Sequence, residues 1–162
     1  MPRLATIGVY GFDRESFLAS LGDAGVGLLL DVRQLRGVRG SEYAWANAKR
    51  LQAALAEAGI GYSHLKELTP TTELREVQYR EDARLGEGKR SRTTLAPEYV
   101  RLYTEQILDP TDLAPIVRWI GESSAALLCV ERDPEACHRS LIAAKLEQEW
   151  GFSVRDLRSP QQ

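Results

Sequence analysis

Short apolar segments that suit buried strands alternate along this chain with longer segments that suit helices. Residues 25–32 are apolar at nearly every position, which is typical of a parallel strand covered on both faces. Parallel neighbours in a sheet need a crossover connection, and a helix usually supplies it. The alternation therefore predicts an α/β fold with a Rossmann-like, doubly wound and mainly parallel sheet.

The apolar runs and the turn residues between them locate the expected elements. Strands are predicted at residues 4–9, 25–32, 60–64, 125–130 and 152–157. Helices are predicted after Asp13 and at residues 43–58, 72–79, 97–108, 111–120 and 135–150. Residues 80–94 interrupt the pattern with mixed charges, and we interpret them as a mobile segment of one domain that spans residues 1–162.

Length and charge limit the classes of function. At 162 residues and 43% apolar content, the chain has the size of one domain with a sizeable core. Lys and Arg number 21 against 23 Asp and Glu, so any site for an anion has to be local. No secretory signal and no apolar run long enough for a bilayer is seen, which predicts a cytoplasmic protein without a membrane partner.

Polar residues gather where the predicted strands end. Ligands of open parallel sheets bind outside the carboxyl ends of the strands. Gly8 and Tyr10 follow the first predicted strand, Asp31 and Arg33 stand at the end of the second, and residues 129–139 follow the fourth. These segments are therefore expected to face one crevice, although they lie far apart in the sequence.

The segment CVERDPEACHR, residues 129–139, is the richest in reactive side chains. A helix that starts near Glu135 would place Cys137, His138 and Arg139 in its first turns, where free N–H groups attract anions and lower the pKa of a thiol. We interpret the crevice as an anion pocket, with Cys137 as nucleophile and Glu131, His138 or Asp31 as proton carriers. The predicted ligand contacts are Arg33, Arg132, Arg139, Gly8 and Tyr10.

Structural alternatives stay open for the same residues. Cys129 and Cys137 can be packed core residues or form a disulfide, and Arg33 can simply pair with Asp31. No metal is predicted, because the Cys-x7-Cys-His spacing departs from that of structural zinc sites and leaves only His64 as a further nitrogen ligand. No cofactor is predicted either, because the first loop lacks the glycine fingerprint of dinucleotide-binding folds.

Four motifs stand along the chain: Thr6–Gly8, Asp31–Arg33, Gly59–Tyr62 and the closing C-x-E-x-x-P-x-x-C-H-R from Cys129 to Arg139. Together they resemble the motifs of the domain of unknown function 488 family. The resemblance runs through nearly the whole chain and implies a Rossmann-like fold with a shared polar pocket. It implies no reaction, because a fold of this type supports many functions.

Three functions compete at this stage. The first is an enzyme that acts on a phosphorylated small molecule, a nucleotide or a nucleic-acid end, using the arginines with Cys137 and Glu131. The second is a non-catalytic nucleotide-binding or nucleic-acid-binding module, which would add the basic residues 89–92. The third is an interaction domain. An enzyme needs a reactive thiolate or a poised acid, whereas a binding module needs salt-sensitive binding without turnover.

Overall fold

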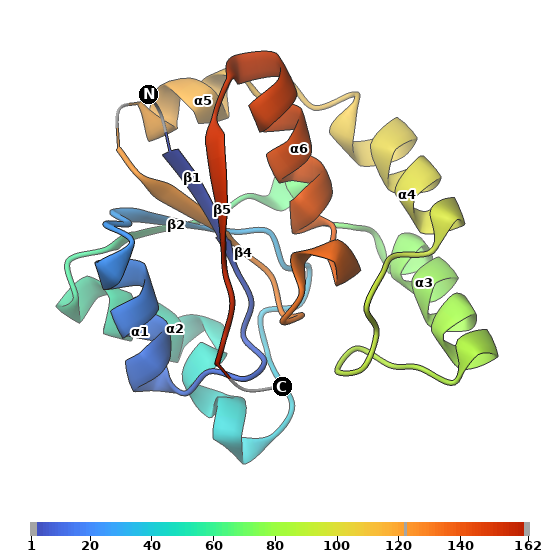
Figure 1. Cartoon of the computed structure of the whole chain (residues 1–162), viewed down its shortest axis with the longest axis horizontal. Coiled ribbons are helices and arrows are strands. Elements are labelled where there is room, and N and C mark those ends of the chain that lie inside the picture. The colour runs from blue at the N-terminus through green and yellow to red at the C-terminus, as the bar shows by residue number, and fades with distance from the viewer. Residues whose placement is uncertain (1–2, 122, 161–162) are drawn as a thin grey trace.

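Parallel strands form the central sheet of the computed structural model, which describes residues 3–121 and 123–160 (Figure 1). Every strand overlaps one of the segments predicted as strands, and all the pairings are parallel, so the predicted parallel sheet is confirmed. The five strands stand in the order β3-β2-β4-β1-β5. They are β1 (Arg3–Ile7), β2 (Leu28–Asp31), β3 (Gly61–His64), β4 (Ala125–Leu128) and β5 (Ser153–Leu157).

Helices connect the strands; α1 and α3 begin at a side-chain cap, and α4 and α5 have a proline in the first turn. The Asp13 carboxylate accepts a hydrogen bond from the Ser16 N–H at 2.8 Å and so starts the first helix. The helices are α1 (Arg14–Asp23), α2 (Ala48–Glu57), α3 (Thr72–Leu85), α4 (Pro97–Tyr103), α5 (Ala114–Ile120) and α6 (Arg139–Trp150). Short 3₁₀ turns cover Ser41–Ala46, Lys66–Leu68 and Pro134–Ala136, and a π-helical turn at Thr104–Leu108 extends α4.

Helices cover both faces of the sheet, which makes the fold a Rossmann-like α/β arrangement. One apolar core joins the sheet to α1 and α2, and the other joins it to α3, α4, α5 and α6 (Figure 1). Successive strand residues such as Leu29 and Leu30 belong to opposite cores, because side chains alternate across a strand. Within the described residues, no helix has the length and apolar character needed to cross a membrane.

The register of the sheet brings the ends of its central strands together. Leu128 in β4 is level with Ile7 in β1 and with Asp31 in β2. Because β4 lies between β1 and β2, the loop after β4 lies between the loops that follow those two strands. This order places residues 129–139 beside residues 32–33.

Most element boundaries differ from the sequence predictions by a few residues, and two of these differences affect the candidate site. The helix expected at 135–150 begins only at Arg139, because Cys137 has extended backbone angles (φ −138°, ψ 147°) that no α-helix contains. Cys137 and His138 therefore precede the helix, and the placement in its first turns was wrong. In the predicted mobile segment 80–94, α3 continues to Leu85 and ends at Gly86, whose φ of 71° suits glycine.

Candidate functional site

A small cavity lies where the loops after β2 and β4 meet α3 and α4. Its volume of about 50 Å³ has room for a few water molecules. Of the residues predicted from the sequence, Arg33, Glu131, Cys137 and His138 line it together. The remaining predicted residues, Asp31, Arg132, Arg139, Gly8 and Tyr10, are outside its lining.

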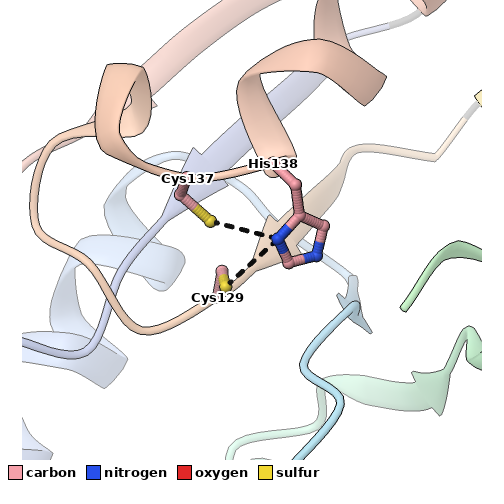
Figure 2. Close-up of side chains that lie close together, drawn as sticks. All are labelled: Cys129, Cys137 and His138. Atoms are coloured by element: carbon pink, nitrogen blue, oxygen red, sulfur yellow. Dashed lines mark hydrogen bonds between the residues drawn. The ribbon is translucent and has the colours of Figure 1, made fainter. Parts of the chain in front are cut away.

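Two thiols and one imidazole converge at the inner end of this cavity. The Nδ1 atom of His138 lies 3.8 Å from Cys129 Sγ and 3.7 Å from Cys137 Sγ (Figure 2). The other ring nitrogen of His138, Nε2, is 2.8 Å from the carbonyl oxygen of Val32, to which it can only donate. In a neutral imidazole this bond leaves the lone pair on Nδ1, facing both sulfur atoms. All three side chains are buried.

The charges around the two thiols separate their acidities. Burial alone would raise the pKa of Cys137, but a hydrogen bond from Cys129 and the positive charge of His138 lower it well below its ordinary value. Burial and the neighbouring Cys137 thiolate raise the pKa of Cys129. Burial alone would also lower the pKa of His138, but the Cys137 thiolate raises it. Cys137 is thus the more readily ionised thiol, and a thiolate can act either as nucleophile or as metal ligand.

Glu131 shares a buried arginine with Asp82. Arg92 donates hydrogen bonds of 2.6 Å to Glu131 Oε1 and to Asp82 Oδ2. The other carboxylate oxygen of Glu131 lies 3.5 Å from Cys129 Sγ. Burial and the charge of Cys137 raise the pKa of Glu131, and Arg92 only partly offsets them. Glu131 is therefore suited to hold a proton beside the sulfur atoms, as the sequence predicts for a proton carrier.

Asp31 and Arg33 form a fully buried pair behind the cavity. The guanidinium of Arg33 donates from Nε to Asp31 Oδ1 at 2.9 Å and from Nη2 to Oδ2 at 2.8 Å. Tyr62 donates its hydroxyl to the same carboxylate at 2.6 Å, and Arg33 also reaches the carbonyl oxygen of Ala46. This matches the structural alternative that the sequence left open for Arg33. The roles of Asp31 as a base and of Arg33 as a ligand contact stay predictions.

The other two predicted arginines also make contacts inside the fold. Arg139, which is 1% exposed, donates to the carbonyl oxygens of Glu131 and Arg132 and so holds the loop after β4 against α6. Arg132 donates to Ser159 and pairs with Asp133. His64 binds the carbonyl oxygen of Arg33 through Nε2 at 2.7 Å. That Arg132 and Arg139 contact an anion stays a prediction. The hydrogen bonds that both guanidinium groups make within the protein do not favour it.

Gly8 lets the loop after β1 pass directly over the loop after β4. A Cβ atom at this position would overlap the carbonyl group of Glu131, which belongs to the backbone and cannot turn away.

We expect Gly8→Ala to lower the free energy of unfolding by about 2–3 kcal/mol, because one loop has to shift. Chemical denaturation measures the change. The control is Gly22→Ala in α1, where a Cβ atom has an open position and alanine suits the helix; equal effects of the two substitutions would contradict this explanation.

A larger cleft adjoins the inner cavity. It has a volume of about 630 Å³, within the range of small-molecule sites. Five lining residues are common to both hollows: Leu35, Arg75, Tyr79, Lys89 and Val130. Four cations line the cleft, and none of its described lining residues is acidic. These cations are Arg39, Arg75, Lys89 and Arg90.

Tyrosine rings lie beside three cations of this cleft, which we call the cationic cleft after Arg39, Arg75, Lys89 and Arg90. The guanidinium carbon of Arg90 lies 5.1 Å from the ring centre of Tyr10, one of the ligand contacts predicted from the sequence. Arg75 and Lys89 lie 5.5 and 5.8 Å from the ring centre of Tyr79. Among residues 3–121 and 123–160, the one carboxylate that pairs with any of these four cations is that of exposed Glu42, 3.5 Å from Arg90. The cleft therefore combines positive charge with half-buried tyrosine rings.

Comparison with protein-family models identifies the family. The model described as "Domain of unknown function DUF488" matches residues 13–146, which is most of the chain. The chain belongs to this family. Comparisons with curated proteins and with solved structures return no match. The family match includes Cys129, Glu131, Cys137 and His138 but not Gly8.

In this member of the DUF488 family, sequence reasoning missed the α3 residues of the site and did not separate the roles of the residues in the following loop. Arg75 and Tyr79 stand on α3, and Arg92 stands in the charged segment among four other cations at 80–90. In the sequence these side chains look like ordinary surface residues, and only their position in the fold places them at the site. The basic residues 89–92 were noted for a binding module, and the structure places Lys89 and Arg90 in the cleft but Arg92 in the interior.

Proposed function

We propose that the protein binds a phosphorylated, nucleotide-like anion in the cationic cleft. The observation that carries the proposal is the set of four cations around a cleft of about 630 Å³ with no acidic side chain among its described lining residues. Such a cleft attracts phosphate groups, and guanidinium and ammonium groups donate strong hydrogen bonds to them. The whole chain has a slightly acidic balance, so the positive charge of this cleft is a local excess.

The tyrosines favour a ligand that carries a ring as well as a phosphate. Tyr10 and Tyr79 are half-buried in the lining, and aromatic side chains stack on nucleic-acid bases. The shared residues Arg75, Tyr79 and Lys89 lead from this cleft to the cavity of Glu131, Cys137 and His138. A ligand seated in the cleft would thus direct one end toward reactive groups, which suits an enzyme that acts on a nucleotide.

A non-catalytic nucleic-acid-binding module is the second candidate. The exposed position of Arg39 and Arg90 at the mouth of the cleft favours it, because a strand of nucleic acid needs charges that reach beyond a closed pocket. ADP and a short single-stranded RNA separate the two candidates. A nucleotide-binding enzyme should bind ADP with a lower dissociation constant than the RNA. A nucleic-acid-binding module should bind the RNA with the lower dissociation constant.

The test is a calorimetric titration of the protein with ADP. We expect Lys89→Ala and Arg39→Ala each to weaken binding about tenfold, through loss of a charge-assisted hydrogen bond of about 1.5 kcal/mol. Arg118→Ala is the matched control, since this exposed arginine on α5 is outside the cleft. Binding should also weaken as salt rises. Unchanged affinity in both cleft variants, or failure of ADP and RNA alike to bind, would reject the proposal.

A further inference from the structure

The convergence of Cys129, Cys137 and His138 leads to an inference that goes beyond anion binding and does not depend on it. Their ligand atoms, two Sγ and one Nδ1, all lie within 4.8 Å of one another in the interior of the protein (Figure 2). Spacing alone disfavours a metal, because seven residues separate the cysteines. The fold removes this obstacle, since the turn at Pro134–Ala136 returns the chain to the end of β4.

The orientation of His138 is that of a metal ligand. Its Nε2 donates to the carbonyl oxygen of Val32 at 2.8 Å, so Nδ1 presents a lone pair to the two sulfur atoms. Metal-ligating histidines almost always have such a partner on the second nitrogen, because it fixes the tautomer and the ring plane. Nδ1 can make only one good hydrogen bond, so it cannot satisfy both sulfur atoms. A cation placed between the three atoms would bind all of them.

The two sulfur–nitrogen distances fit a tetrahedral zinc ion. With Zn–S bonds of about 2.3 Å and a Zn–N bond of about 2.0–2.1 Å, tetrahedral angles separate sulfur from nitrogen by roughly 3.6 Å. The observed Sγ···Nδ1 separations are 3.7 and 3.8 Å. Thiolate and imidazole ligands favour zinc over magnesium, calcium and manganese, which prefer oxygen. The N–H of Arg139 also donates to Cys137 Sγ at 3.5 Å, which favours the thiolate that a metal needs.

We propose that Cys129, Cys137 and His138 bind one zinc ion. Three protein ligands leave the fourth tetrahedral position open, which is the pattern of catalytic rather than structural zinc sites. The three ligands line the inner cavity, so the open position faces the space that adjoins the cationic cleft. Glu131 Oε2 lies 3.5 Å from Cys129 Sγ, so this carboxyl group stands beside the proposed metal position.

Metal titration of the reduced full-length chain tests this site. The protein is stripped with a chelator, its two thiols are confirmed free, and it is titrated with Zn²⁺ against a chromophoric chelator without any phosphate compound. We expect one Zn²⁺ per chain. Co²⁺ should give the intense visible bands of a tetrahedral site and a thiolate-to-cobalt charge-transfer band. Failure of ADP binding would leave this result unaffected, so the two proposals fail separately.

Single substitutions identify the ligands. Cys129→Ser and Cys137→Ser should each weaken Zn²⁺ binding by at least about tenfold and reduce the charge-transfer band. His64→Gln is the matched control, since His64 is the other histidine of the chain and lies outside the cavity lining. Circular dichroism checks that each variant is folded. A folded wild-type chain that binds no Zn²⁺, or whose Co²⁺ spectrum lacks the charge-transfer band, overturns the proposal without recourse to any variant.

Discussion

Replacing Asp31 by alanine is expected to lower the free energy of unfolding by about 3–5 kcal/mol. The substitution leaves the guanidinium of Arg33, which is 1% exposed, without the carboxylate that accepts two of its hydrogen bonds. A buried charge without a partner costs far more than a neutral pair of the same shape. Urea denaturation followed by circular dichroism measures the change.

Two controls separate this effect from the loss of any ion pair. Glu57→Ala removes the exposed partner of Arg14, at 3.3 Å, and should cost less than about 1 kcal/mol. The double substitution Asp31→Leu with Arg33→Met should be more stable than Asp31→Ala alone, since it removes both buried charges. A loss from Asp31→Ala no larger than that from Glu57→Ala would show that the buried pair does not stabilise the fold.

The second large effect is expected from Arg92→Met. This substitution removes the cation that Asp82 and Glu131 share and leaves two carboxylates in the interior. We expect a loss of about 3 kcal/mol or more, together with faster proteolysis in the loop at residues 86–96, because Arg92 ties this loop to the end of β4. Thermal unfolding and limited proteolysis followed by mass spectrometry provide the two measurements.

Arg101→Met is the matched control for Arg92. Arg101 also bridges two acids, Glu98 and Glu105, but its side chain is 55% exposed. Exposed pairs contribute little, so this variant should lose less than about 1 kcal/mol and retain the protease resistance of the loop. Similar losses in the two variants would refute the view that burial gives Arg92 its effect.

The central strands were predictable because burial on both faces leaves a direct mark in the sequence. Residues 25–32 and 125–130 are apolar almost throughout, and both contain strands at the centre of the sheet. The start of α6 was not predictable in the same way. Pro134 suits both an α-helix and a 3₁₀ turn, and only the contacts of the loop after β4 determine that the chain stays extended at Cys137.

Part of the candidate site could be anticipated from the sequence, but its contacts could not. The rule that ligand-binding residues follow the strands groups Arg33 with Glu131, Cys137 and His138, and these four residues line one cavity, whereas the other five predicted residues lie outside its lining. The rule does not show which arginines are used inside the fold. Arg33 and Arg139 are fully buried, whereas Lys89 and Arg39, which resemble ordinary loop charges in the sequence, line the cleft.

The most direct test of the proposed function is a crystal structure of the protein grown with saturating ADP. We expect the phosphate groups in the cationic cleft, within hydrogen-bond distance of Lys89 and at least one of Arg39 and Arg75, with the adenine against Tyr10 or Tyr79. Well-ordered ADP bound away from these residues, or a cleft without ADP at saturating concentration, would contradict the assignment of this cleft as the ligand site.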